Sequence, residues 1–71
     1  MKDELVYDNS IYPLEVILRA IDDYSNICAV EVVQTGKDTR CIFSEGKTDM
    51  SVIMREFTNY LLELMEKWGE Q

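Results

Sequence analysis

The sequence predicts a small α+β domain whose elements follow the order βαββα. Residues 14–24 and 50–68 repeat apolar side chains at the spacing of a helix face. Residues 4–8, 27–34 and 39–44 are short segments with the alternation or the β-branched content of strands. Because a helix joins the first two strands, we expect a three-stranded antiparallel sheet in the order 1-3-2, with both helices on one face.

The first strand leads into the first helix through a short turn. Residues 4–8 alternate, which places Leu5 and Tyr7 on one face of the strand. Pro13 is favoured at the first helical position, because its missing N–H is not needed there. We expect this helix to end near Ser25. Its buried stripe should consist of Leu14, Ile17, Leu18, Ile21 and Tyr24.

The second and third strands are expected to form a hairpin. A two-residue Gly36-Lys37 turn suits type II′, whose first central position favours glycine. The resulting register pairs Val33 with Arg40, Val32 with Cys41 and Val30 with Phe43. A slip of one residue would mix apolar and polar side chains on each face, so this register is preferred.

The second helix is expected to begin after an N-cap at Thr48 or Asp49 and to end near Trp68. Its core stripe should consist of Met50, Ile53, Phe57, Tyr60, Leu61, Leu64 and Trp68. Three further residues extend the apolar surface sideways, and we name them the helix-two flank: Met54, Leu62 and Met65. Two interpretations of this flank stay open, a wider core with one exposed leucine or a surface that binds a partner.

The expected topology is half of a ferredoxin-like unit that lacks its last strand. The whole chain, residues 1–71, should form this single domain. Both edges of such a sheet are unpaired, and the first strand offers its backbone groups to a second chain beside Leu5 and Tyr7. The charged residues around this edge are also consistent with a strand that simply stays solvated.

Composition limits the classes of partner. The apolar fraction of 46% is too high for a disordered chain. The formal net charge of −7 argues against binding to nucleic acid and to an anionic membrane surface. No apolar run approaches the length of a membrane span, and the first residues carry no hydrophobic signal-peptide region. We therefore expect a cytoplasmic protein.

Side-chain chemistry predicts neither a metal site nor a cofactor site. Histidine is absent from the sequence, which removes the commonest general base and metal ligand. In the expected register Cys28 and Cys41 lie roughly 13 Å apart along the sheet, too far for a disulfide. We expect two buried free thiols, and no metal site because there is no CxxC pair.

Asp22 and Asp23 are the candidates for paired catalytic carboxylates. Neighbouring residues on a helix point about 100° apart, so the two carboxylates do not converge on one point. A solvated helix face is the preferred interpretation. A small enzyme or enzyme subunit that uses these surface carboxylates stays as an alternative.

Several short segments together resemble a known bacterial family. They are Leu5-Val6-Tyr7-Asp8, Ser10-Ile11-Tyr12-Pro13-Leu14-Glu15, Ala20 with Tyr24, and Glu56-Phe57-Thr58-Asn59-Tyr60-Leu61-Leu62. Over nearly the whole chain the sequence resembles the D protein of the His-Xaa-Ser system (HxsD-like). The resemblance implies an accessory role beside radical-SAM peptide-maturation proteins and carries no catalytic residues.

We therefore expect a non-enzymatic module that binds a protein or a peptide. The residues expected to contact this partner belong to the first strand and to the helix-two flank: Leu5, Tyr7, Met54, Leu62 and Met65. A purely structural homo-oligomer, with a homodimer as its simplest form, is the remaining alternative.

Overall fold

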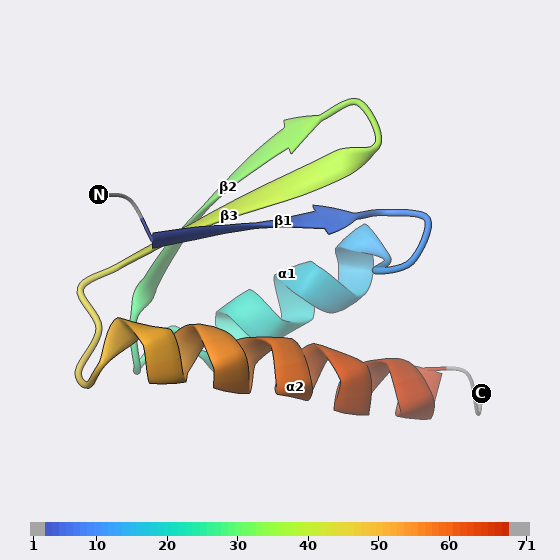
Figure 1. Ribbon diagram of the computed structural model, residues 1–71. Coiled ribbons are helices and arrows are strands. Elements are labelled where there is room, and N and C mark those ends of the chain that lie inside the picture. Colours follow the sequence, from blue (N-terminus) through green and yellow to red (C-terminus); the bar gives the residue numbers. More distant parts are fainter. Residues whose placement is uncertain (1–2, 69–71) are drawn as a thin grey trace.

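The computed structural model describes residues 3–68 and confirms the expected α+β architecture. Its elements are β1 (Asp3–Asp8), α1 (Leu14–Asp23), β2 (Ala29–Thr35), β3 (Asp38–Ser44) and α2 (Met50–Trp68). The strands form one antiparallel sheet in the order β1-β3-β2, and both helices lie on the same face of it (Figure 1). The described part of the chain does not include the side chain of Trp68, so the expected place of this side chain in the core stays a prediction.

The β2–β3 hairpin has the predicted register. Gly36 and Lys37 form its turn, and Gly36 takes a φ of 57°, a left-handed conformation that glycine adopts readily. The cross-strand pairs are those expected: Val33 with Arg40, Val32 with Cys41 and Val30 with Phe43. On its other side β3 pairs with β1, so that Leu5 lies opposite Cys41 in the middle of the sheet.

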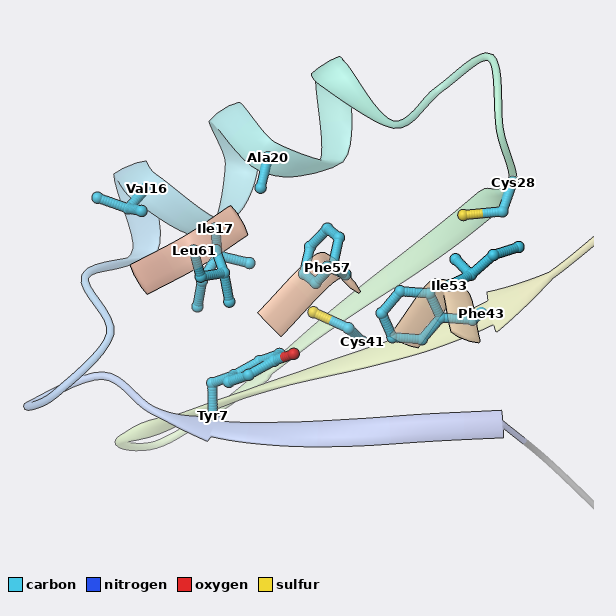
Figure 2. Close-up of a cluster of buried hydrophobic side chains, with 10 residues drawn as sticks. All are labelled: Tyr7, Val16, Ile17, Ala20, Cys28, Cys41, Phe43, Ile53, Phe57 and Leu61. Atoms are coloured by element: carbon cyan, nitrogen blue, oxygen red, sulfur yellow. The ribbon is translucent and has the colours of Figure 1, made fainter. Parts of the chain in front are cut away.

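The core lies between the sheet and the helices, around the fully buried ring of Phe57 (Figure 2). The centroid of this ring lies 5.1 Å from that of Phe43 and 5.2 Å from that of Tyr24, both in edge-to-face contacts. Such contacts add to the stabilisation that comes from burying apolar area. Other buried residues of the core are Tyr7, Val16, Ile17, Ala20, Cys28, Cys41, Ile53 and Leu61. Strands and helices therefore share one core.

The buried stripe of α1 differs from the predicted one. Leu18, which was expected to be buried, is 47% exposed, whereas Val16 and Ala20 are buried. The reason is that α1 packs against α2 as well as facing the sheet, so its buried arc is rotated toward Val16 and Ala20. The helix begins at Leu14, and Pro13 is its N-cap with an extended ψ of 139° rather than its first helical residue.

An aspartate shapes the turn before each helix. Asp49 caps α2, because its Oδ1 accepts the backbone N–H of Ser51 at 2.9 Å and the hydroxyl of Ser51 at 2.8 Å. Asp8 accepts the same two bonds from Ser10, at 2.9 and 2.8 Å, after β1. These hydrogen bonds lower the pKa of both carboxyls, since they favour the charged form.

Asn9 joins the turn after β1 to the β2–β3 hairpin, which is distant in the sequence. Its side-chain oxygen accepts hydrogen bonds from the buried hydroxyl of Thr39 at 3.0 Å and from the amide of Gln34 at 3.1 Å. Its side-chain nitrogen donates to the carbonyl of Tyr12 at 3.1 Å, and its backbone N–H donates to the carbonyl of Lys37 at 2.8 Å. Asn9 therefore holds the turn end of the hairpin against the start of α1.

Candidate functional site

The outer side of β1 is the first of the two surfaces that the sequence predicts for partner contact. β1 is an end strand of the sheet, and within residues 3–68 no other strand pairs with its outer side. Leu5 is half-buried and Tyr7 is 5% exposed, and both pack into the core beneath the sheet. A second chain at this edge would therefore meet mainly backbone groups.

Tyr7 anchors β1 to α2. Its hydroxyl lies 2.8 Å from that of Thr58, which in turn donates to the carbonyl of Met54 at 3.2 Å. The hydroxyl of Thr58 therefore accepts the hydrogen bond from Tyr7. Burial raises the pKa of Tyr7 to about 12, because it disfavours the charged phenolate. This strand is thus fixed from below by a neutral, hydrogen-bonded ring.

The β1 edge is strongly acidic. Three of its six residues are carboxylates: Asp3, Glu4 and Asp8. Glu4 lies 3.1 Å from Arg40 in a partly exposed ion pair, which contributes little to stability. Charged side chains on an edge strand discourage indiscriminate pairing with other strands. This edge can therefore pair only with a strand that tolerates its carboxylates.

The helix-two flank is the second predicted surface, and its three residues differ in burial. Met54 and Met65 are half-buried and pack against the core, whereas Leu62 is 48% exposed. Both interpretations of the flank expect an exposed Leu62, so this arrangement leaves both of them open. Contact of Leu62 with a partner stays a prediction.

The two candidate carboxylates lie at the end of α1, and both residues are exposed. The hydroxyl of Tyr60 donates to Oδ2 of Asp23 at 2.5 Å, and Nε of Arg19 lies 3.6 Å from the same oxygen. The hydrogen bond to Asp23 raises the pKa of Tyr60. Asp23 is therefore engaged in a contact between the two helices.

Both cysteines are buried free thiols. Burial raises the pKa of Cys41 to about 11 and also raises that of Cys28, which makes both poor nucleophiles at neutral pH. Among residues 3–68 no group of three or more His, Cys, Asp or Glu side chains is placed to hold a metal ion. Over the same range no helix has the length and apolar character needed to cross a bilayer.

A surface groove that the sequence reasoning missed lies at the start of β2. It has a volume of about 460 Å³, and we name it the α1–β2 groove. Its apolar lining comes from the end of α1, the loop that follows and the start of β2: Ile21, Ile27, Cys28, Ala29 and Val30. Glu45 and Lys47, from the segment that joins β3 to α2, are its charged lining residues.

The local backbone explains why this groove forms. The amides of Ile27 and Cys28 donate to the carbonyl of Tyr24 at 2.8 and 3.1 Å, so the turn that ends α1 continues past the expected strand start. β2 therefore begins at Ala29, two residues later than predicted. The backbone N–H of Lys47 donates to the carbonyl of Ile27 at 3.0 Å and brings the two loops together beside β2 (Figure 1).

No signal in the sequence pointed to this groove. Ile27 is β-branched, which favoured its inclusion in the strand, and its 38% exposure depends on how the two loops meet.

The fold and these surfaces define a class of protein. The described part of the chain is a small α+β domain that has the first five of the six elements of a ferredoxin-like unit and two unpaired sheet edges. The family model described as His-Xaa-Ser system protein HxsD matches residues 7–65, which is most of the chain. The chain therefore belongs to the HxsD family, as its sequence resemblance indicated. Comparison with curated proteins gives no match, and neither does comparison with solved structures.

Proposed function

We propose that this chain is a non-enzymatic binding module that serves as an accessory factor of the His-Xaa-Ser system in bacterial peptide maturation. Its partner is a protein or a peptide. Family membership supports the accessory role, because the family is described by the system to which it belongs and not by a reaction.

The observation that carries this proposal is the strand order β1-β3-β2. It leaves two strands with an unpaired outer side within residues 3–68, and such edges hold rows of backbone N–H and C=O groups. Strand addition to an exposed edge is a common mode of peptide recognition, with affinity from the backbone and specificity from alternate side chains.

The proposal is tested by measuring whether this chain binds the proteins that the neighbouring genes encode. Where the neighbouring genes encode a radical-SAM enzyme and a short precursor, each is purified and mixed with this chain. Light scattering is expected to show a complex with at least one of them, and hydrogen exchange should show slower amides on a sheet edge. Absence of a complex with either protein would overturn the proposal.

The alternatives give different results in the same experiment. A structural homo-oligomer shows a mass that rises with its own concentration and does not change when either candidate partner is added. An enzyme converts the precursor without the radical-SAM protein, and the Asp22→Asn, Asp23→Asn double variant loses this conversion. Tyr60→Phe is the matched control, because it removes the hydrogen bond to Asp23 and keeps both carboxylates.

A further inference from the structure

The β2 edge lacks the three carboxylates that limit pairing at the β1 edge. β2 has seven residues, and Glu31 is its one charged residue. Three of its residues are valines, which favour extended backbone. A strand of this length and composition at the end of a sheet is competent to pair with a further strand unless something covers it. Within residues 3–68 no strand occupies this position.

The α1–β2 groove adjoins the start of this edge. Val30 of β2 and Ile27 of the preceding loop both line it, and Ile27 is 38% exposed. A strand laid along β2 reaches the groove at the Ala29 end and can place a side chain in it. Burying an apolar side chain there removes apolar surface of both chains from water, which favours binding.

The alternation of β2 specifies the two faces of such a strand. Val30 and Val32 pair with Phe43 and Cys41, which are buried on the helix side of the sheet. Glu31 therefore belongs to the other, open face. Added residues beside Val30 and Val32 face the helix layer and the groove, whereas those beside Glu31 face the open side.

Charge decides between a second copy of this chain and a different protein. The chain carries a formal net charge of −7, so a second copy approaches against repulsion of like charges. At the edge itself the charged side chain is Glu31, and in the groove Lys47 is balanced by Glu45. A basic segment from another protein is attracted both by the whole chain and by Glu31.

We propose that the β2 edge and the α1–β2 groove bind an extended segment of another protein as a fourth strand, with apolar residues facing the groove and a lysine or arginine beside Glu31. This inference rests on the proposed function and assigns its binding site and the chemistry of its partner.

A designed peptide is the probe. The sequence Thr-Val-Lys-Val-Lys-Val-Thr, capped at both ends, has the seven residues of β2 and the required alternation. In an NMR titration the amides of residues 29–35 should shift and exchange more slowly, while those of residues 3–8 stay unchanged. A peptide with glutamates in place of the lysines should bind several-fold more weakly at low salt, because it repels Glu31.

Two further comparisons separate strand pairing from loose attraction. Replacing the central valine of the peptide with proline removes a backbone donor and should abolish binding. Ile27→Glu should weaken binding by about tenfold, because it puts a carboxylate into the groove that the peptide covers. Ile11→Glu is the matched control, since Ile11 is 59% exposed and does not line the groove.

Each other result overturns the inference. These results are no binding, protection of residues 3–8 in place of 29–35, equal binding of the glutamate or the proline peptide, or equal effects of the two isoleucine variants. If the amides of residues 29–35 exchange more slowly when this protein alone is made more concentrated, a second copy occupies the β2 edge and the inference is also wrong.

Failure of the proposed function gives a distinct result. If a complex with a protein of the His-Xaa-Ser system slows amide exchange on β1 or on the helix-two flank and not on β2, the proposed function stands and the proposed β2 site is wrong. The lack of any such complex removes the function.

Discussion

Within residues 3–68 the outer sides of β1 and β2 are both unpaired, but different structures support them from below. Under β1, the Tyr7 ring is buried and hydrogen-bonded to α2, and three of the six strand residues are carboxylates. Under the start of β2 there is a groove of about 460 Å³, and Glu31 is the one charged residue of the strand. We therefore expect a further strand to add side-chain contacts to its backbone bonds at the β2 edge and to rely mainly on backbone bonds at the β1 edge.

The largest expected difference between the edges is in stability. Tyr7→Ala should cost about 3–5 kcal/mol, close to the whole stability of a domain of this size, and leave the chain largely unfolded. Val30→Ala should cost about 1 kcal/mol, because Val30 is only half-buried. Urea unfolding followed by circular dichroism measures both.

Tyr7→Phe is the control for the first of these variants. It keeps the ring and loses the hydrogen bond to Thr58, which should cost about 1 kcal/mol. Equal losses for Tyr7→Ala and Val30→Ala would remove the distinction between an anchored and an unanchored edge.

The second expected difference is in the reactivity of the two cysteine thiols, with Cys28 reacting faster than Cys41. Cys41 is fully buried under the sheet with its pKa raised to about 11, whereas Cys28 is 6% exposed and lines the α1–β2 groove. We expect iodoacetamide at pH 8 to modify Cys28 faster by about tenfold or more, because thiolate supply and access both favour it. Mass spectrometry of digested protein gives the two rates. Faster modification of Cys41 would mean that the reagent reaches the thiol beneath the sheet more readily than the thiol in the groove.

The untreated protein provides a second check on the cysteines. Its mass under non-reducing conditions should match that of the fully reduced chain, since both thiols are free. A mass lower by two hydrogen atoms would indicate a disulfide between Cys28 and Cys41, which would also contradict the register of the hairpin.

A substitution at Leu62 tests whether a partner contacts α2 instead of a sheet edge. Leu62→Glu should change stability by less than about 0.5 kcal/mol, because the side chain is 48% exposed. Leu61→Glu is the neighbouring control and should unfold the domain, since Leu61 is fully buried. If Leu62→Glu abolishes binding of a system protein while its stability is unchanged, α2 is the contact surface and neither edge is.

The smallest expected effect is a dependence of stability on pH in the acid range. Hydrogen bonds from Ser10 and Ser51 lower the pKa of Asp8 and Asp49 in the folded chain below the ordinary value of 3.8. Stabilisation by these carboxylates is present above that value and is lost as the pH falls through the lowered folded pKa.

Thermal unfolding between pH 2 and pH 7 tests this effect, with pH values chosen to bracket the carboxyl pKa. Asp8→Asn and Asp49→Asn should each flatten the curve at its acid end. An unchanged curve for both variants would assign the acid sensitivity to other carboxylates.

Much of the fold follows from local sequence. The helix between the first two strands was sufficient for the strand order, and the glycine at position 36 was sufficient for the hairpin register. The exposure of Leu62 followed from its angular position on the helix. Each of these features depends on one element or on the short connection between neighbouring elements, which is why a single sequence predicts it.

The features that were missed depend on how elements meet. Leu18 is exposed because α1 turns toward α2, and the apolar periodicity of one helix does not reveal that rotation. The α1–β2 groove forms where two loops join through the Ile27 carbonyl, and the strand propensity of Ile27 obscured it.

The junction at Asn9 has a consequence for how the protein ages. An asparagine followed by serine is a common site of spontaneous deamidation, and here the amide is held by bonds to Thr39, Gln34 and Tyr12. Conversion to aspartate replaces the nitrogen donor with an oxygen, so a carboxylate faces the carbonyl of Tyr12. The hydrogen bonds that join the hairpin to α1 thus also hold this amide in place, and we expect deamidation of Asn9 to require opening of the junction.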